Sequence, residues 1–566
     1  MELPGSGGGI LNDVGGTLTL DNIFIEGNTA NRAGGGLEDV SGNATVVTLT
    51  EVSLTSNNAG TNPGNGGGVH ISGDGNIEIT GGIVSNNMAI EGGGLWNNIG
   101  SMMVSDVYFE ANIANGNDPD QGGGAIYNNG GALAVDSASY FTANVAAGIS
   151  GSGGAIFNNT DGTVDIRNTT FVSNESNRAG GAIEDASGVI MALQIDSCLF
   201  ELNDAGDNPG NGGAIHMTGM GDISVSNSYF DSNIAGGTGG ALWNGAGVMT
   251  VEATGIIDNV AGTGAGGIYN TTGEVNVMNS TISRNMVSTV SGIGGGITNL
   301  PDGTVTVTSS TISENTSFKS GGAIYNEGTL EVMNSTLYNN QSDTLSGGIM
   351  QVGSTASINL TGSIVAGNSS ASGFGDADLE GSVMGGGYNL IGIDHLNLFG
   401  SNNTNITGTL NSPVDPMLDT LTNNGGFTRT HSIICGSPAY NAGDPNDNSP
   451  DQRGLAVFGM RRDIGSFEYQ DTCATISTTE PATRIEIENI YPNPVKNQMI
   501  IDLGILANNE EFDWTIIELS SGTIKMAGQT RANRLNLNVS NLAGGSYAIE
   551  FRNSEKIGIK RFIIIE

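Results

Sequence analysis

Residues 321–340 read GGAIYNEGTLEVMNSTLYNN, one unit of a repeat that decides the fold. Each unit opens with glycines and an aliphatic residue, and about fifteen residues later it reaches another apolar residue followed by Asn. The opening signal recurs at intervals of about 26 to 32 residues, at Gly7, Gly34, Gly66, Gly92, Gly122, Gly153, Gly180, Gly212, Gly239, Gly266, Gly294, Gly321 and Gly347. A fixed period of this length is typical of a solenoid.

The segments between these openings carry the pattern of β-strands. GTVDIRN, GEVNVMN and GTLEVMN alternate apolar and polar residues, which is the period of a strand and not of a helix. Three short strands in a unit of this length predict one coil of a right-handed parallel β-helix. About thirteen coils stacked at about 4.8 Å would make a rod on the order of 60 Å long.

Stacking explains why particular residues return. Equivalent positions lie above one another, so we expect Gly where the corner needs a positive φ or leaves no room for Cβ. We expect the following aliphatic residue to point inward, and the Asn that ends FEAN, FTAN, FVSN, FELN and FDSN to bond along its own ladder. The match of residues 10–42 with 155–188 indicates that a block of about five coils has been duplicated.

Composition limits the class of protein. The chain has 566 residues, a formal net charge of -39 and a pI near 4.1, so binding to nucleic acid or to anionic membranes is not expected. No run of about 18 apolar residues predicts a transmembrane segment. The first residues lack the pattern of a signal peptide, and because Met1 lies almost inside the first repeat we expect the true N-terminus to be missing.

Two resemblances describe the first two parts of the chain. Residues 1–370, with paired GGA[I/L/V] and FxxN signals, resemble the repeats of chlamydial polymorphic outer-membrane proteins, a resemblance that implies a β-helix, a surface location and adhesion. Residues 371–469 are predicted to be the last coils and, at residues 415–469, a cap over the open end of the rod. Their elements NNGGFTRTH, GSPAYNAGD, DQRG and DIGSFE resemble the choice-of-anchor Q domain of bacterial surface proteins. Arg453, Arg461 and Arg462 are expected to form ion pairs within the cap.

The end of the chain has a third pattern. After a polar linker at residues 470–488, residues 489–566 read as about seven strands of a small β-sandwich. This part resembles the type A C-terminal sorting domain of the type IX secretion system of Bacteroidetes. The resemblance rests on Tyr491, Pro492, Asn493 and Pro494, on Gly544, Gly545 and Tyr547, and on a basic final strand. It implies an address read by the type IX secretion machinery and a protein that is secreted or held at the outer-membrane surface.

A candidate ligand face follows from the alternation of side chains. The residue after each inward aliphatic should point outward, which gives the order Leu11, Glu38, His70, Trp96, Tyr127, Phe157, Glu184, His216, Trp243, Tyr269, Thr298, Tyr325 and Met350. The run Glu-His-Trp-Tyr therefore appears twice, as Glu38, His70, Trp96, Tyr127 and as Glu184, His216, Trp243, Tyr269. We expect an exposed strip that binds sugar rings or a protein. The alternative is that the aromatic side chains only stack on one another and stabilise the sheet.

Chemistry is harder to predict. A polysaccharide lyase or glycoside hydrolase on a β-helix scaffold is the alternative function, but the acid pairs Glu38/Asp39 and Glu184/Asp185 should point to opposite faces, and bases are scarce and unclustered up to residue 370. We therefore favour a protein without catalytic activity that contacts carbohydrate or protein.

No cofactor is expected apart from calcium, for which the candidate ligands are the loop acids Asp118, Asp120, Asp207, Asp444 and Asp447. Cys435 and Cys473 are candidates for a disulfide, with Cys198 buried on a strand.

Overall fold

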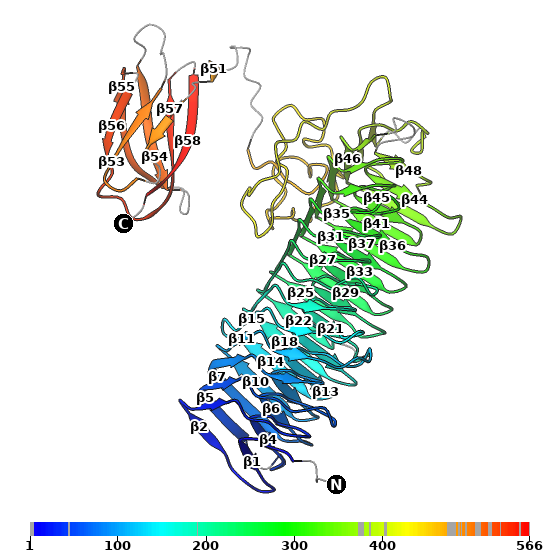
Figure 1. Ribbon diagram of the computed structural model, residues 1–566. Helices are drawn as coiled ribbons and strands as arrows, with labels where there is room; N and C mark the ends of the chain where they lie inside the picture. The colour runs from blue at the N-terminus through cyan, green and yellow to red at the C-terminus, as the bar shows by residue number, and fades with distance from the viewer. Residues whose placement is uncertain are drawn as a thin grey trace. The chain divides into compact units, whose positions relative to one another are not determined.

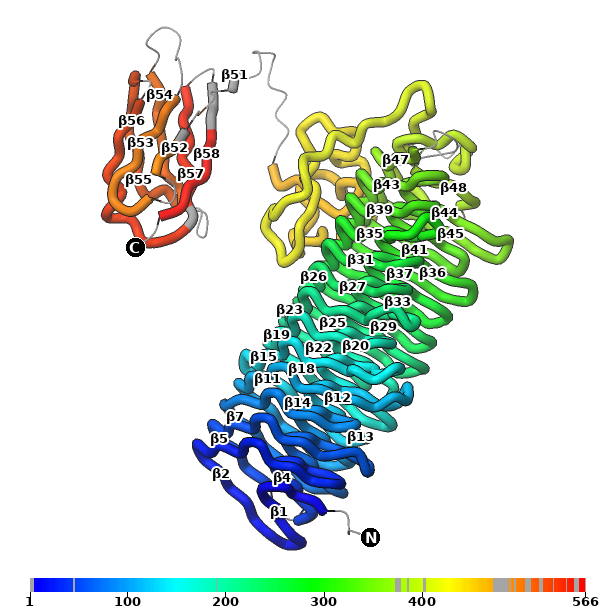
Figure 2. Tube along the Cα trace, viewed as in Figure 1, coloured from blue at the N-terminus to red at the C-terminus, as the bar shows by residue number. Residues whose placement is uncertain are grey.

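The fold is all-β in a computed structural model that describes residues 5–43, 46–189, 191–371, 378–383, 386–400, 404–471, 483–484, 487, 489–492, 495–503, 511–518, 523–532, 534–553 and 556–564. The chain divides into two compact units, Met1–Cys473 and Ala474–Glu566. In the first unit the coils stack into a rod, which confirms the predicted parallel β-helix (Figure 1, Figure 2). No helix within the described ranges is long and apolar enough to cross a membrane.

The first sheet carries the Gly-Gly-aliphatic signal and joins fourteen parallel strands among the described residues. Its register places each aliphatic residue beside its equivalent, for example Ile156 beside Ile183 and Ile183 beside Ile215. The strands are β1 (Ile10–Asn12), β4 (Leu37–Asp39), β6 (Val69–Ile71), β9 (Leu95–Asn97), β13 (Ile126–Asn129), β17 (Ile156–Asn159), β21 (Ile183–Asp185), β24 (Ile215–Met217), β28 (Leu242–Asn244), β32 (Ile268–Asn270), β36 (Ile297–Asn299), β40 (Ile324–Asn326), β44 (Ile349–Gln351) and β48 (Leu379–Glu380).

The second sheet carries the alternating segments, and a corner divides it into two rows. At this corner each coil has at least one residue with a positive φ, such as Asn168, Ser197 and Asn227. The first row is β2 (Thr19–Asp21), β5 (Val46–Thr55), β7 (Asn76–Ser85), β10 (Ser101–Ser105), β14 (Ala132–Asp136), β18 (Thr163–Arg167), β22 (Leu193–Asp196), β25 (Ile223–Ser226), β29 (Val248–Glu252), β33 (Glu274–Met278), β37 (Thr304–Thr308), β41 (Thr329–Met333) and β45 (Ser357–Thr361).

The second row begins each FxxN signal, and β5 and β7 continue into it without a break. It comprises β3 (Phe24–Glu26), β11 (Tyr108–Glu110), β15 (Tyr140–Thr142), β19 (Thr170–Val172), β23 (Leu199–Glu201), β26 (Tyr229–Asp231), β30 (Gly255–Ile257), β34 (Thr281–Ser283), β38 (Thr311–Ser313), β42 (Thr336–Tyr338), β46 (Ile364–Ala366), β49 (Leu390–Ile391) and β50 (Ile406–Thr407). Most coils therefore have four short strands where the sequence predicted three.

The third sheet is short and follows the FxxN corner. Its strands pair in two groups, β8 (Met88–Ala89), β12 (Ile113–Ala114), β16 (Val145–Ala146) and β20 (Glu175–Ser176), and β27 (Ile234–Ala235), β31 (Val260–Ala261), β35 (Met286–Val287), β39 (Thr316–Ser317), β43 (Gln341–Ser342) and β47 (Ser369–Ser370). From this sheet the chain returns to the next Gly-Gly corner.

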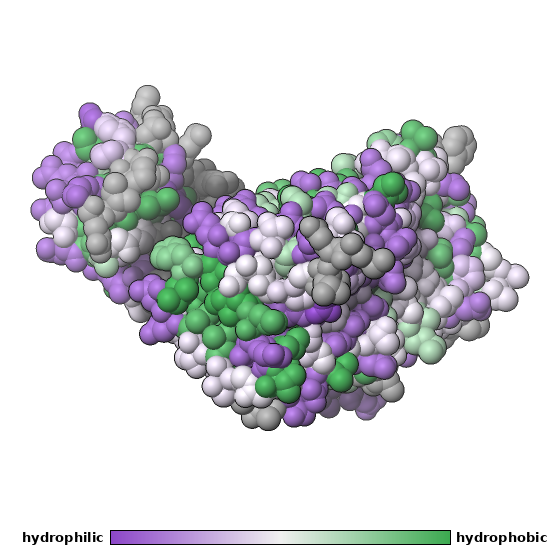
Figure 3. Space-filling model, turned by 60° about the horizontal axis from the view of Figure 1, so that its bottom comes forward, coloured by the Kyte–Doolittle hydropathy of each residue, from purple (hydrophilic) through white to green (hydrophobic). Residues whose placement is uncertain are grey.

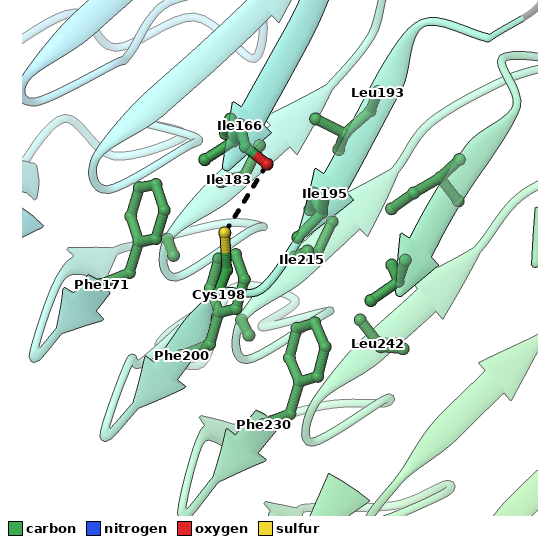
Figure 4. Close-up of a cluster of buried hydrophobic side chains, with 14 of the residues drawn as sticks. Ile166, Phe171, Ile183, Leu193, Ile195, Cys198, Phe200, Ile215, Phe230 and Leu242 are labelled. Atoms are coloured by element: carbon green, nitrogen blue, oxygen red, sulfur yellow. Dashed lines mark hydrogen bonds between the residues drawn. The ribbon is translucent and has the colours of Figure 1, made fainter. Parts of the chain in front are cut away.

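The core of the rod consists of residue ladders. Phe171, Phe200 and Phe230 stack with ring centroids 4.8 and 4.7 Å apart and meet aliphatic residues of the opposite sheet (Figure 4). The Sγ of Cys198 lies 3.7 Å from the carbonyl oxygen of Ile166 inside this core, and burial raises the pKa of this thiol to about 12. Cys198 is buried as predicted, but it lies at the corner between β22 and β23 and not on a strand.

The Asn of each FxxN signal forms a second, polar ladder. The side chain of Asn174 donates to Oδ1 of Asn203 at 2.9 Å and to the carbonyl oxygen of Phe141 at 3.0 Å, while its own Oδ1 accepts from the backbone and side chain of Asn144. The same pattern runs from Asn28 to Asn368. An Asn inside the ladder thereby satisfies buried groups of both neighbouring coils.

The Gly-Gly corner has two separate reasons for glycine. Gly180 has a φ of 62°, where a side chain is strained. For Gly181 the restriction is space, because a Cβ would lie 2.1 Å from the carbonyl oxygen of Gly213 in the next coil. Both predicted reasons are confirmed, and they apply to consecutive residues.

Residues beyond the last coils behave differently from the expected end cap. Leu398 and Phe399 pack against the core of the rod, so the stretch before residue 400 closes its end. Ile433, Ala439, Ile464 and Phe467 instead form a core with β46 and β49 on the flank. The expectation that residues 415–469 cover the open end is therefore wrong, because their apolar residues pack against the outer face of the second sheet. The name cap is kept below for residues 415–469, which cover the flank of the rod.

The second unit has two sheets around its own core. One sheet has the order β51 (Thr483–Arg484), β58 (Lys556–Ile564), β57 (Gly545–Arg552), β54 (Phe512–Glu518) and β55 (Ile524–Thr530), and the other contains β52 (Asn489–Tyr491), β53 (Gln498–Asp502) and β56 (Arg534–Asn538). β51 lies inside the range predicted as linker and pairs with β58. From residue 489 onward the described strands number seven, as the alternation predicted.

Candidate functional site

The predicted outward ladder on the first sheet has the expected order. The strand register pairs Glu38 with His70, His70 with Trp96 and Trp96 with Tyr127. The second copy pairs Glu184 with His216, His216 with Trp243 and Trp243 with Tyr269. The eight candidate residues therefore lie in two runs on one sheet, on the face opposite the core.

The expectation that this ladder is exposed is wrong for most of its residues. Trp96 is 5% exposed and Tyr127 is 2% exposed. Nε1 of Trp96 donates to Glu91 at 3.2 Å, and the hydroxyl of Tyr127 donates to the carbonyl oxygen of Asp120 at 2.7 Å. The cause is the connection at residues 115–121, which folds over the sheet before the next Gly-Gly corner. The alternation of side chains along a strand predicts on which side of the sheet a residue lies, but it does not predict which other segment covers that residue.

Within the ladder the rings stack along the rod. The His70 and Trp96 rings are 4.4 Å apart, and those of His216 and Trp243 are 4.1 Å apart. The next pairs are more offset, since the Trp96 and Tyr127 centroids lie 6.2 Å apart and those of Trp243 and Tyr269 lie 6.4 Å apart. The predicted mutual stacking is present, and the offset leaves part of each indole face without a ring against it.

A charged group begins each run. Glu184 accepts from Thr218 at 2.6 Å, lies 2.8 Å from Nδ1 of His216, and has Arg178 at 3.7 Å. In the first copy Glu38 is paired with Arg32 and lies 3.6 Å from His70. Burial acts to raise the pKa of the Glu38 carboxyl, but His70 and Arg32 outweigh burial and hold it below its usual value. Burial lowers the pKa of His70 despite its acidic neighbour.

The acid pairs point to opposite faces, as predicted. Asp185 lies in a ladder of amides on the inner side, where its Oδ1 accepts from Asn158 at 2.6 Å. Burial raises the pKa of Asp185 to about 6, although the hydrogen bond from Asn158 opposes this shift. Glu184 and Asp185 are thus separated by the sheet and each has its own partners, an arrangement unlike two carboxyl groups that flank one glycosidic bond.

The two copies of the duplication differ in their cover. Thr238 stands where the first copy has Glu91, because the bridge from Asn65 to Glu91 corresponds to the bridge from Asn211 to Thr238. The Nε1–H of Trp243 consequently has no acceptor among the described residues. Trp243 and Tyr269 are half-buried, whereas Trp96 and Tyr127 are buried. The second copy is therefore the more accessible of the two.

The other predicted sites lie apart from this ladder. No group of three His, Cys, Asp or Glu side chains suited to a metal occurs in the described ranges. Asp118 lies in the connection over Tyr127, and Asp447 accepts from Asn334 at 2.7 Å and lies 3.7 Å from Arg462. Cys435 is exposed, and Cys473 lies outside the described residues.

The predicted ion pairs of the cap are present for two of its three arginines. Arg453 meets Asp451 at 2.6 Å and lies over the ring of Phe467 at 3.6 Å. Arg462, which is fully buried, contacts Asp447. Arg461 instead donates to the carbonyl oxygen of Ala442 at 2.6 Å. These charges hold the cap together.

The residues of the predicted sorting signal fall on the second unit. Tyr547 is buried, donates to the carbonyl oxygen of Ala543 at 2.9 Å and stacks with Phe562, so its role here is structural. Tyr491 lies at the surface with Arg534 over its ring, Pro492 follows it, and Gly544 and Gly545 precede Tyr547 at the start of β57. Asn493 and Pro494 lie outside the described residues.

Comparison with known proteins gives one match. Residues 489–566 match the family described as the secretion system C-terminal sorting domain. No curated protein and no solved structure matches the chain. The protein is therefore a parallel β-helix that carries a type IX C-terminal sorting domain and is secreted or displayed at the cell surface.

Proposed function

We propose that the exported rod is an adhesin-like surface protein that contacts carbohydrate at the second copy of the duplicated ladder. The observation that carries this proposal is that Trp243 and Tyr269 are half-buried and that the indole N–H of Trp243 finds no acceptor in the described part of the chain. A sugar offers both C–H groups for the uncovered part of an aromatic face and hydroxyls that accept hydrogen bonds. Because this N–H is buried, binding at this place requires the groups that cover it to move aside.

The charged group beside the pair supports a neutral or acidic sugar. Arg178 is partly exposed and lies 3.7 Å from Glu184, which also contacts His216. The protein as a whole is strongly acidic, so a polyanion would be repelled at long range while a single acidic sugar could still meet Arg178.

The duplication supplies the matched variants for a test. The full chain is applied to a glycan array, and bound glycans are then titrated against wild type, Thr238→Glu and Glu91→Thr. Thr238→Glu places the acceptor of the first copy in the second, so it should abolish binding. Glu91→Thr lies under the connection at residues 115–121 and should leave binding unchanged.

The same experiment covers the alternative function. Incubation of the bound glycans with the full chain, followed by assays for unsaturated products and reducing ends, should show no turnover. Sugar release would replace the adhesin-like function with a lyase or hydrolase. Glycan binding that survives Thr238→Glu would remove the second copy as its site.

We further propose, from their resemblances, that the repeats are of the polymorphic outer-membrane-protein type, that residues 371–469 form a choice-of-anchor Q domain, and that the source belongs to the Bacteroidetes. Calcium at the loop acids also stays a prediction.

A further inference from the structure

A second column of side chains runs along the outside of the rod, on the second row of the second sheet. Its members occupy the position directly before the inward residue of each coil, and their register makes them neighbours. We call it the outer column: Phe24, Ser53, Ile83, Tyr108, Tyr140, Thr170, Leu199, Tyr229, Gly255, Thr281, Thr311, Thr336, Ile364 and Leu390.

The cap covers the C-terminal half of the outer column. The hydroxyl of Tyr229 donates to the carbonyl oxygen of Phe427 at 2.7 Å, and the two rings stack at 5.3 Å. The hydroxyl of Thr281 donates to the carbonyl oxygen of Arg429 at 2.5 Å. Farther along, Thr336 accepts from the backbone and side chain of Ser466 at 3.0 Å.

The covering segment is extended and runs along the rod. Phe427 meets β26, and His431 meets Ser313 of β38 at 2.8 Å, three coils farther on. Three coils advance about 14 Å, and four residues of extended chain span about the same distance. Alternate carbonyl oxygens of an extended chain point to the same side, which is why the column hydroxyls can bond those of Phe427 and Arg429.

The N-terminal half of the same column has no such cover in the described structure. Phe24 is 76% exposed, Ile83 is 43% exposed and Tyr108 is 37% exposed. Tyr108 and Tyr140 stack at 5.3 Å with their rings nearly parallel. The hydroxyls of Tyr108, Tyr140 and Thr170 have no hydrogen-bond partner among the described residues. Figure 3, in which the N-terminal end comes forward, shows that hydrophobic residues gather in a patch on this side of the molecule.

The surface beside the uncovered half is acidic. Glu26, Glu51, Asp106, Glu110 and Asp136 are exposed on the same or adjoining strands and corners. Up to residue 166 the sequence contains one base, Arg32, and Arg32 is paired with Glu38 of the first sheet. A ligand for this face must therefore combine apolar groups, hydrogen-bond acceptors and positive charge.

We propose that the uncovered half of the outer column, from Phe24 to Leu199, is the docking surface for an extended, basic and aromatic segment of a partner protein, which lies along the rod axis as residues 427–431 do. The partner's alternate carbonyl oxygens accept from Tyr108, Tyr140 and Thr170, and its aromatic side chain packs at an end of the tyrosine stack. The continuity with the cap interface identifies a polypeptide as the occupant, since the same column already binds one.

The probe is a fluorescent peptide with the sequence of residues 425–433, GGFTRTHSI, titrated with the full chain at low salt and followed by polarisation. Saturable binding is expected. The double variant Tyr108→Ser with Tyr140→Ser should weaken it at least tenfold, whereas Met103→Ser, an exposed residue on the adjoining row, should not change it. Replacing the peptide Arg by Glu should weaken binding at least tenfold, and added salt should reduce the affinity.

A second variant separates docking from folding. Glu110→Lys with Asp136→Lys keeps the tyrosine stack and should still lower the affinity tenfold or more. The proposal is overturned if the wild-type chain shows no saturable binding up to about 1 mM peptide, or if both double variants bind as the wild type does. Loss of oligosaccharide binding in the tyrosine variant, without peptide binding by the wild type, would assign this face to carbohydrate instead. Glycan binding that depends on Thr238 bears only on the function proposed above.

Discussion

Replacement of one Asn in the middle of the polar ladder should destabilise the rod far more than replacement at its start. In Asn174→Ala the backbone N–H of Asn144 loses its acceptor at 3.1 Å, and the Asn144 side chain loses one of its two acceptors. Phe141 and Asn203 each lose a donor as well. A buried donor left without a partner costs about 1–3 kcal/mol, and each other lost bond costs about 1 kcal/mol.

These losses add to about 4–6 kcal/mol for Asn174→Ala. Asn28→Ala is the matched control, because Asn28 is partly exposed and, among the described residues, its side chain donates to Asn57 and Glu26 without accepting. Its removal leaves no buried donor unsatisfied and should cost about 1 kcal/mol. Both variants lose the hydrogen bond to the next Asn of the ladder. The difference between their unfolding free energies therefore measures the effect of burial and of the bonds to the preceding coil.

Hydrogen exchange is the suitable assay, because a stacked repeat does not unfold in a single all-or-none step. In Asn174→Ala the free energy of opening of peptides that cover residues 140–148 should fall by the sum of these losses. The free energy of opening of distant coils should fall much less. Urea unfolding followed by tryptophan fluorescence gives an independent comparison of the two variants. Costs for Asn174→Ala and Asn28→Ala that agree within about 0.5 kcal/mol would refute the reasoning that buried reciprocal bonds stabilise the ladder.

Three further predictions concern single positions. Gly181→Ala should destabilise the rod by at least about 3 kcal/mol, because its Cβ would overlap the next coil. In Gly188→Ala the new Cβ meets no atom within 4 Å, so this variant should lose only about 1–2 kcal/mol for its positive φ. Similar melting temperatures for the two variants would contradict this prediction. Leu202, exposed and with a φ of 55°, should gain up to about 1 kcal/mol on replacement by Asn, which tolerates this conformation; urea midpoints of the variant and of the wild type test it. Asp185 has a pKa of about 6 against an ordinary 3.8, so its folded form holds the proton more tightly and its contribution to stability falls as the pH rises from about 4 through 6. Asp185→Asn should therefore stabilise the rod at pH 8 and not at pH 4, and a pH-independent effect would argue against a buried carboxylate.

The sequence allowed the stacking to be predicted because each coil repeats the same few requirements. The inward aliphatic residue, the Gly that has no room for Cβ, and the buried Asn each have one physical reason that recurs in every coil, so alternation and period were enough to place them. Glu38 beside His70 beside Trp96 followed from the same register.

The cover over these ladders was not predictable in the same way. The connection at residues 115–121 and Thr238 in place of Glu91 decide which ring reaches solvent, and such connections carry no period. The outer column could have been found, since Tyr108, Tyr140 and Tyr229 each precede the Phe of an FxxN signal and must point away from the core. Where the cap packs depends on contacts between residues more than a hundred positions apart, which no local pattern records.

The orientation of the strands has a mechanical consequence when the rod is pulled along its axis. Because the strands lie across the rod, tension along its axis loads the inter-coil hydrogen bonds in the direction in which they separate, one coil after another. Each coil that detaches replaces about 4.8 Å of rod by on the order of 100 Å of extended chain. Pulling the full chain in an optical trap should thus produce a staircase of small steps that dissipates load gradually, and a single abrupt rupture of the whole rod would be incompatible with this geometry.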